Sequence, residues 1–557
     1  IRLLRTWLYD EKDILKAFDL EGIINSLQKN CDEKNFEQLA KNFIVENYKQ
    51  AIVHLLPTIE KENKEKDLIS YKSKLSEKEV EEILEETKKL QEWQASTDKK
   101  EDLEKIKSVD AREVELKNPF NKTNFETINN IKYSHFNTIT NGISYSKLLF
   151  DITDFSVKQL QYASLLTYLL FNFNTKEKTE AEVVKEISAN LGGLSSHIDV
   201  FRKYKSDKCE VKFIVGAKNL VEKAEKLVTI MKETTLNADF DNKEALYSVL
   251  LEIKLMLDNK FKNSGHAFVA RRISSYNSIH GKLTSYHSEY DFYLFIEGLL
   301  DNFEQNITNI QDNLYKVVKL IFNRSRLLVN FVGDNEEYIN YKKIILSYIN
   351  KLPNDINKQD GFNILLKEDN YSEGFYFDSL VQYVGVGYNV GHYSGTHLVL
   401  RHILSLDYLW NNVRVRNGAY GSGAIFSTFG DFTLWSYRDP NLTETLDIYY
   451  NIAEYIANFD ADNNELNKYI IGALNTLDVL MSPSAQASYS LAQYLTESPY
   501  EKYDVIVSEI KNTTVTDLKK LCSEFENRRF SSFKCVLGAK EKVLKNKELF
   551  TQTIELK

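Results

Sequence analysis

The sequence is poor in residues that break or cross-link a chain. Its 557 residues include only 6 prolines, 21 glycines and 4 cysteines. So little glycine and proline argues against a fibrous or disordered protein. None of the cysteines forms a C-x-x-C pair, and a chain of this length does not need disulfides to hold a core. We therefore expect reduced thiols at Cys31, Cys209, Cys522 and Cys535.

Long apolar runs and an excess of positive charge are also missing. The longest apolar run, residues 164–173, is about half as long as the roughly 20 residues that a membrane-spanning helix needs. The formal charge is −9 and the pI is about 5.7, whereas phosphate binding relies on clustered lysine and arginine. We expect neither a nucleic acid nor a membrane among the partners.

Signatures of a self-contained catalytic centre are absent. The sequence has 9 histidines but no H-x-x-E-H and no H-E-x-x-H, the helical motifs that bind catalytic zinc. His397 and His402 are five residues apart on a predicted helix, which rotates them by roughly 140° around its axis. His392 is close to them, but no Asp or Glu stands between these histidines. We therefore predict no metal site in this chain.

The glycine-rich stretches match no nucleotide-binding or hydrolase motif. Gly385, Gly387 and Gly391 have spacings of two and four, where the dinucleotide fingerprint needs two and three. The run 418–423 lacks the Lys-Ser/Thr ending of a phosphate loop, and it is too compact for a G-x-S-x-G nucleophile turn.

The length predicts two to four domains, and 43% apolar residues with 12% aromatics are ample for their cores. A helical pattern covers residues 36–46, and the apolar run 50–56 is typical of a strand. Ser76 and Glu79 form a capping box that begins a helix reaching to about residue 94, with a second helix predicted over 59–75. We interpret residues 1–58 as the tail of a domain and 59–118 as a helical hairpin linker.

Two longer blocks follow, residues 119–355 and 356–557, each with strand patterns before helical ones. Strand-like runs flank Asn141-Gly142, a strong hairpin signal, and further strands are predicted at 211–215 and 327–332. The second block repeats this order, with two antiparallel candidates at 424–428 and 432–437. The fold class is α+β, and the repeated order predicts a structural duplication.

One region carries a motif that is more specific than these general patterns. It reads LWNNVRVRNGAY over 409–420, followed by GSGAIFSTFGDFTLWSYRDPNLTETLDIY over 421–449. It resembles the C-terminal domain of the presequence proteases and falcilysin, in the pitrilysin (insulinase-like) family. The shared pattern is Trp410, VRV at 413–415, GAYG at 418–421 and SYRDPNL at 436–442. Weaker matches occur at 7–13, at 263–266 and at 383–385.

The resemblance implies four homologous α/β-sandwich domains in two halves, joined by a helical hairpin and enclosing a chamber. This chain would be the C-terminal half, with two such domains. Zinc and its H-x-x-E-H helix would belong to the N-terminal half of the same protein, which we expect to precede Ile1. Substrates would be unfolded peptides, such as targeting peptides or globin fragments. The compartment would be a mitochondrion, plastid or food vacuole in a eukaryote, and the cytoplasm in a bacterium.

By position, the resemblance assigns Arg414 and Tyr420 to the zinc active site as catalytic and substrate-binding residues. Both side chains are suitable donors to substrate carbonyls and to a developing oxyanion. Gly418, Ala419 and Gly421 would let substrate or backbone approach closely. The structural alternative is that Arg414 pairs with a carboxylate and Tyr420 fills a core.

A different class of function also fits the fold, because proteins with a related fold include non-catalytic subunits. The alternative is therefore a pitrilysin-fold binding or scaffold protein. The complete Arg-to-Tyr motif weighs against it, since a scaffold has no need of these donors. We interpret the Arg438-Asp439 pair within the same motif as structural, an internal ion pair or a turn.

Overall fold

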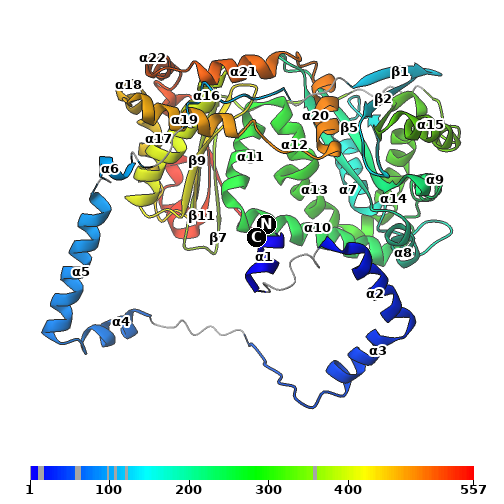
Figure 1. The fold of residues 1–557 in the computed structure, drawn as a ribbon, viewed down its shortest axis with the longest axis horizontal. Helices are drawn as coiled ribbons and strands as arrows, with labels where there is room; N and C mark the ends of the chain where they lie inside the picture. Colours follow the sequence, from blue (N-terminus) through cyan, green and yellow to red (C-terminus); the bar gives the residue numbers. More distant parts are fainter. Residues whose placement is uncertain are drawn as a thin grey trace. The chain divides into compact units, whose positions relative to one another are not determined.

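The computed structural model describes residues 2–9, 18–56, 64–96, 99–103, 105, 109–118, 123–355 and 361–556. The chain divides into two units, residues 1–107 and 108–557. In its described residues the first unit is helical (Figure 1). Its helices are α1 (Arg2–Tyr9), α2 (Leu20–Asp32), α3 (Asn35–Ala40), α4 (Lys64–Lys72), α5 (Glu77–Ala95) and α6 (Lys100–Leu103).

The helical predictions in this unit are confirmed where they can be followed. Helix α3 continues into a π-helical segment, Lys41–Val45, so that regular structure covers most of 36–46. The capping box is present at the start of α5: the Ser76 amide donates to Glu79 Oε2 at 2.8 Å, and the Glu79 amide donates to Ser76 Oγ at 3.3 Å. Helix α4 lies inside the range predicted at 59–75, of which residues 59–63 are outside the described part.

The strand predicted at 50–56 is wrong. Residues 51–56 have no regular structure, and the side chains of Ile52, Val53, Leu55 and Leu56 are exposed. A strand needs a neighbour for its backbone hydrogen bonds, and none of the described strands pairs with this segment. The apolar pattern identified a segment that has no partner among the described strands of this chain.

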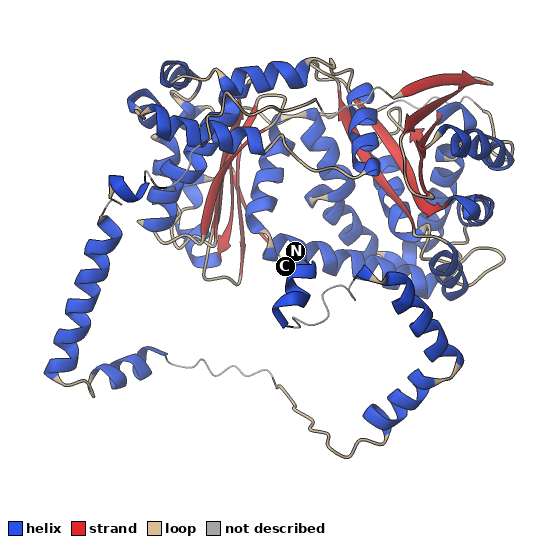
Figure 2. Ribbon diagram, in the orientation of Figure 1, coloured by secondary structure: helices blue, strands red, loops and turns tan. Residues whose placement is uncertain are grey.

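The second unit contains two six-stranded sheets (Figure 2). The order in the first is β1-β2-β6-β3-β5-β4, and in the second β12-β7-β11-β8-β10-β9. The strands of the first are β1 (Asn124–Ile128), β2 (Ile131–Asn137), β3 (Ile143–Asp151), β4 (Gly193–Arg202), β5 (Cys209–Leu220) and β6 (Leu327–Gly333). Those of the second are β7 (Ser372–Phe377), β8 (Tyr383–Asn389), β9 (Gly421–Phe426), β10 (Asp431–Tyr437), β11 (Phe533–Ala539) and β12 (Gln552–Glu555).

Five strands of each sheet follow the same path, which confirms the predicted duplication. In both sheets the first of these five strands pairs in parallel with the last, β2 with β6 and β7 with β11. The last then pairs antiparallel with the second, and the second with the fourth. Only the sixth strand differs: β1 is antiparallel to β2, whereas β12 is parallel to β7.

The hairpin predicted at Asn141-Gly142 is wrong, although the turn itself is present. Both residues have positive φ, 52° and 78°, as a type I′ turn requires. However, β6 lies between β2 and β3, so the strands flanking the turn do not pair. The observed hairpin is one step earlier, where Asn129 and Asn130, also with positive φ, connect β1 to β2.

Helices from each block cover the other block's sheet. Helix α11 lies against β8, β10 and β11, and α20 lies against β6 (Figure 1). The first block has α7 (Val157–Leu169), α8 (Glu180–Asn190), α9 (Ala224–Leu236), α10 (Lys243–Asn263), α11 (Gly265–Asn277), α12 (Ile279–Ser288), α13 (Tyr290–Asp301), α14 (Phe303–Ile321) and α15 (Asn335–Ile349). The second has α16 (Gly395–Ile403), α17 (Thr443–Tyr450), α18 (Ile452–Asn458), α19 (Asn463–Asn475), α20 (Pro483–Leu495), α21 (Lys502–Lys511), α22 (Val515–Lys520) and α23 (Lys540–Lys545).

This exchange buries both faces of the second sheet. Along β11, Cys535 and Leu537 belong to the core that continues into the first block, while Val536 belongs to the core under α16. The alternation follows from the two-residue period of a strand. None of the described helices combines the length and apolar character needed to cross a bilayer.

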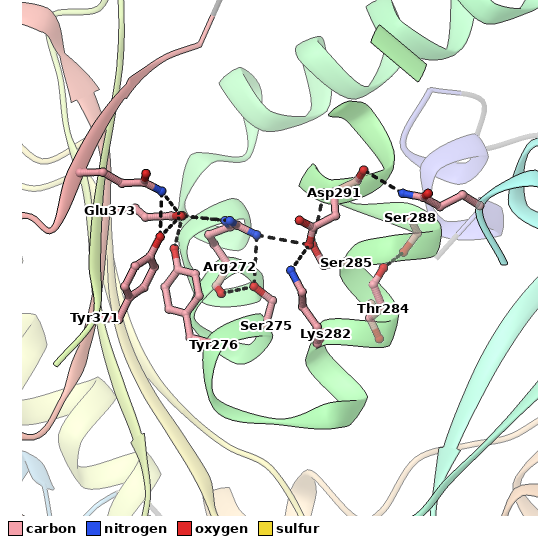
Figure 3. A network of polar contacts seen from close by, with 12 residues as sticks. Arg272, Ser275, Tyr276, Lys282, Thr284, Ser285, Ser288, Asp291, Tyr371 and Glu373 are labelled. Atoms are coloured by element: carbon pink, nitrogen blue, oxygen red, sulfur yellow. Dashed lines mark hydrogen bonds and ion pairs between the residues drawn. The ribbon is translucent and has the colours of Figure 1, made fainter. Parts of the chain in front are cut away.

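A buried polar network crosses between the blocks (Figure 3). Arg272 on α11 donates to both oxygens of Glu373 on β7, at 2.7 and 3.1 Å. The hydroxyls of Tyr276 and Tyr371 donate to the same carboxylate. Burial opposes the charge on Glu373, but the Arg272 guanidinium and these hydrogen bonds outweigh it and hold the pKa of the carboxyl below its ordinary value.

Candidate functional site

Arg414 lies at the end of a widened helix. Helix α16 continues into two π-helical segments, Leu404–Tyr408 and Trp410–Val415, and Arg414 belongs to the second. Such π-helical turns are rare in proteins, and where they occur they often lie at functional sites. The guanidinium carbon lies 3.9 Å from the centre of the Trp410 ring. No carboxylate of the described residues forms an ion pair with Arg414. Its guanidinium instead makes a cation–π contact with the Trp410 ring.

A glycine turn ends this helix. Gly418 has φ +79°, a left-handed conformation that glycine adopts without steric cost. Its amide donates to the Arg414 carbonyl at 2.9 Å, and the Ala419 amide donates to the Val413 carbonyl at 3.2 Å. Ala419 is buried, which fixes the turn to the core. The turn therefore joins the backbone of Arg414 directly to the segment that carries Tyr420.

Tyr420 does not fill a core. Its side chain is 68% exposed, while its amide donates to the Tyr437 carbonyl at 3.0 Å. The rings of Tyr420 and Tyr437 meet edge to face, with their centres 5.8 Å apart. The phenol is thus held at its base and open at its hydroxyl, as a donor to a bound ligand must be.

Packing within this chain is loose at Gly421 and close at Gly423. A Cβ at Gly421 would lie 3.7 Å from Tyr437 Cβ, which is an ordinary contact. At Gly423, which opposes Trp435 in the β9–β10 ladder, a Cβ would lie 2.7 Å from the indole ring. Packing within this chain therefore requires Gly423, which the sequence had not singled out.

His266 is a further residue that the sequence interpretation missed. It lies at the start of α11, and its ring centre is 5.0 Å from that of Trp435 and 4.9 Å from that of Tyr437. Burial lowers the pKa of its imidazole, and its buried Nδ1 has no hydrogen-bond partner among the described residues. His266 thus supports the aromatic rings on which Tyr420 rests. The resemblance at 263–266 was the only signal for it.

The Arg438-Asp439 pair has a structural role, although it is neither a regular turn nor an ion pair among the described contacts: the chain bends at Arg438, and Asp439 forms a β-bridge with Gln382. Arg438 has φ +48°, and Asp439 is fully buried. The Asp439 carboxylate accepts from the Asn441 amide at 2.9 Å and from Thr445 Oγ1 at 2.7 Å. Burial raises the pKa of this carboxyl, and the hydrogen bonds partly offset that rise. The pair anchors the end of β10 behind Tyr420.

The residues present do not fit the catalytic zinc of a pitrilysin-type peptidase, because the H-x-x-E-H motif is absent. The sequence has no Asp or Glu between the histidines of the 392–402 region, but the fold brings a carboxylate to two of them. Glu524, which is 127 residues from His397 in the sequence, lies between His392 and His397. His402 is elsewhere, against Gly472. Sequence spacing could not reveal a ligand brought in by the tertiary fold.

Two family models match the chain, one over residues 56–118 and most of the first block, the other within the second block. The model of a domain associated with subfamily C of the M16 peptidases matches residues 56–299, and the model described as "PreP C-terminal domain" matches residues 373–538. The second match contains the whole segment from Arg414 to Tyr420.

Curated relatives match nearly the whole chain. Protein HypA of Clostridium perfringens is 30% identical over 99% of this chain and 57% of its own length. Presequence protease 1, chloroplastic/mitochondrial, of Arabidopsis thaliana is 25% identical over 93% of this chain and 49% of its own length. The mitochondrial presequence protease of Drosophila melanogaster is 23% identical, over 96% and 52%. The chain thus spans about half the length of these relatives.

Solved structures share the fold at low sequence identity. A peptidase M16 inactive domain from Pseudomonas fluorescens superposes with a TM-score of 0.52 at 15% identity, covering 75% of this chain and 98% of that one. A protease from Helicobacter pylori gives 0.54 at 17% identity, covering 75% and 99%. The two duplicated sheets, the matched domains and these relatives together lead to one conclusion: the chain belongs to the pitrilysin (M16) metallopeptidase family and corresponds to the C-terminal half of its presequence-protease branch.

Proposed function

We propose that this chain supplies Arg414 and Tyr420 to the active site of a zinc peptidase whose metal-binding half is another segment of the same protein. The observation that carries the proposal is the exposure of Tyr420 together with an Arg414 that no carboxylate of the described residues neutralises. Both residues lie in the part of the chain that matches the PreP C-terminal domain.

The chemistry of the two side chains suits this role. Hydrolysis of a peptide bond passes through an oxyanion, and donors aimed at it stabilise the transition state. The guanidinium of Arg414 offers charged donors in a fixed plane, and the hydroxyl of Tyr420 offers one neutral donor. We assign both to substrate carbonyls and to the developing negative charge. The turn formed by Gly418 and Ala419 sets the distance between their backbones.

The proposal of a partner half is supported by exposed apolar side chains on the first unit. Between residues 2 and 56, large apolar side chains of α1–α3 and of the segment after them are exposed. None of the residues in α2 and α3 is buried. Surface of this kind marks a protein–protein contact. Examples are Leu8, Ile24, Phe43, Ile44, Val45, Ile52, Val53 and Leu55. We infer that the N-terminal half of the protein covers it.

The substrates we propose are unfolded peptides, because several of the relatives are named presequence proteases. Targeting peptides or globin fragments are the candidates. The compartment would follow the source, an organelle in a eukaryote and the cytoplasm in a bacterium. The catalytic zinc would be bound by the N-terminal half, since this chain lacks the H-x-x-E-H motif.

The test is whether activity requires a second half. Mass spectrometry of the protein purified from its source should reveal a companion segment with the H-x-x-E-H motif and one zinc. The assembled protein should degrade an unfolded peptide, lose activity to a chelator, and leave a folded protein of similar composition intact. A zinc-free species without a companion and without peptidase activity would instead support the binding or scaffold function.

A further inference from the structure

Three side chains from two distant parts of the second block meet at the start of α16. His392 precedes the helix, His397 lies in its first turns, and Glu524 comes from the short helical turn Leu521–Glu524 near the end of the chain. His397 Nε2 lies 3.0 Å from Glu524 Oε2, and His392 Nε2 lies 3.4 Å from Glu524 Oε1. The two imidazole rings are nearly perpendicular, with their centres 4.9 Å apart.

We propose that His392, His397 and Glu524 form a zinc-binding site. Two imidazoles and one carboxylate are a ligand set that zinc uses with water in its fourth position. Bonds of roughly 2.0–2.2 Å in a tetrahedron place neighbouring ligand atoms roughly 3.3 Å apart. The two nitrogen–oxygen distances here are close to that value, and all three ligand atoms lie within 4.8 Å of one another. A small movement of His392 would complete the geometry.

The surroundings give the ion both an anchor and an access path. His397 is fully buried, and the Glu524 side chain is only 17% exposed, so these two ligands are fixed by packing. His392 is 59% exposed and also lines a cavity of about 720 Å³. An ion can therefore reach His392 from solvent and bind to the buried His397 and the partly buried Glu524.

Ser394 supplies the supporting contact that a ligating histidine needs. Its amide approaches His397 Nδ1 at 3.2 Å, and its hydroxyl lies 2.8 Å from the same atom. In the metal-free site Nδ1 accepts from this amide, so the ring proton is on Nε2 and is donated to Glu524. Zinc at Nε2 would require the ring proton on Nδ1. There it would be donated to the Ser394 hydroxyl, and the hydrogen bond from the Ser394 amide to Nδ1 would have to break. Such a contact orients the ring and raises the basicity of the ligating nitrogen.

The ion would connect the start of α16 to the turn that precedes β11. Helix α16 leads through its π-helical continuation to Arg414. The bound ion would thus fix the first end of the helical element formed by α16 and its π-helical continuation, whose other end carries Arg414. The ion should stabilise the folded protein, because it binds the folded chain and not the unfolded one.

The experiment is a zinc titration of the protein and of three variants, followed by calorimetry and by the absorption spectrum of bound Co²⁺. His392→Ala removes the exposed ligand with little risk to folding, and Glu524→Gln removes the charge of the carboxylate. Ser394→Ala removes only the supporting hydroxyl. The matched control is His197→Ala, because the half-exposed His197 also lies near one carboxylate, Asp199 at 3.5 Å, but belongs to no group of three ligand side chains among the described residues.

The expected result is the loss of one bound zinc in His392→Ala and in Glu524→Gln, with His197→Ala unchanged. Ser394→Ala should keep the site but bind zinc about 10–100-fold more weakly. Zinc at about 100 times its Kd should raise the Tm of the parent protein by roughly 2–3 °C, and not that of His392→Ala. Mg²⁺ and Ca²⁺ should not compete, since they prefer oxygen ligands. Equal zinc content and an equal Co²⁺ spectrum in the parent and in His392→Ala would overturn the proposal.

Discussion

The guanidinium of Arg414 lies over the indole of Trp410, with 3.9 Å between the guanidinium carbon and the ring centre. The two residues are four positions apart on the same widened helix, so each presents its side chain to the same side. Trp410 thereby limits the rotamers of Arg414 without neutralising its charge. An arginine held in this way is ready to bind a carbonyl oxygen or an oxyanion.

This stacking predicts that Trp410 is a positioning residue. In the assembled peptidase, Trp410→Ala should lower kcat by about 2–5-fold, because an exposed cation–π contact contributes roughly 0.5–1 kcal/mol. Trp410→Phe should restore most of the activity, since it keeps an aromatic face. Steady-state kinetics on an unfolded peptide would measure both. Equal losses in the two variants would mean that Trp410 acts through packing alone.

The glycine turn predicts a sharp difference between two neighbouring positions. Gly418→Ala should lower the free energy of unfolding by about 1–2 kcal/mol, because Gly418 has φ +79°. Gly421→Ala is the control, since its new Cβ would make an ordinary contact at 3.7 Å. Urea unfolding measures both. The argument fails if Gly421→Ala is the more destabilising of the two.

The Arg272–Glu373 pair predicts a large loss of stability when one partner is removed (Figure 3). Arg272→Met leaves a buried carboxylate without its cation and should cost about 3–5 kcal/mol. The double variant Arg272→Met/Glu373→Met should recover part of that loss, because no charge then remains buried at this pair. Chemical unfolding of the two variants gives the comparison. A double variant less stable than Arg272→Met would contradict this account.

His287 predicts a pH dependence of stability. Burial lowers the pKa of its imidazole to about 4, from an ordinary value of 6.5. Below pH 6.5 the unfolded chain therefore binds a proton that the native state does not. Stability should be complete above about pH 6.5 and fall by up to about 3 kcal/mol as the pH drops towards 4. His287→Asn should flatten this slope. His280, whose pKa is also lowered mainly by burial, should contribute in the same direction.

The four thiols should react in order of exposure. Cys31 is exposed and should react first with a thiol reagent, whereas Cys535 is buried and burial raises its pKa. Burial also raises the pKa of Cys209 to about 11, which should slow its reaction. Mass spectrometry after timed labelling would follow each site. Early modification of Cys535 in the folded protein would be inconsistent with the packing of β11.

Local signals in the sequence predicted local structure well. The capping box at Ser76 and the apolar run at 327–332 gave a helix start and a buried strand because their causes lie within a few residues. The pairing order could not be predicted in this way. Strand β6 enters between β2 and β3 after more than 170 intervening residues, and this insertion separates the strands on either side of Asn141-Gly142.

The residues of the candidate site also differ in whether local sequence could predict them. Arg414 and Tyr420 were identified by a motif contained in twelve residues, and the turn between them follows from Gly418. His266 and Glu524 were missed, because each reaches its neighbours only through the fold. The strand pattern at 50–56 failed for a related reason: its apolar residues have no partner strand in the described part of the chain.

The most direct test of the central claim is the kcat of Arg414→Ala and Tyr420→Phe in the assembled peptidase, with zinc content measured on the same samples. Arg416→Ala is the control, because Arg416 is an exposed arginine two residues away whose side chain bonds only to Asn412 among the contacts described. Both site variants should lose about 10²–10³-fold in kcat with zinc unchanged, as expected when an oxyanion donor is removed. Turnover equal to that of Arg416→Ala would contradict the account.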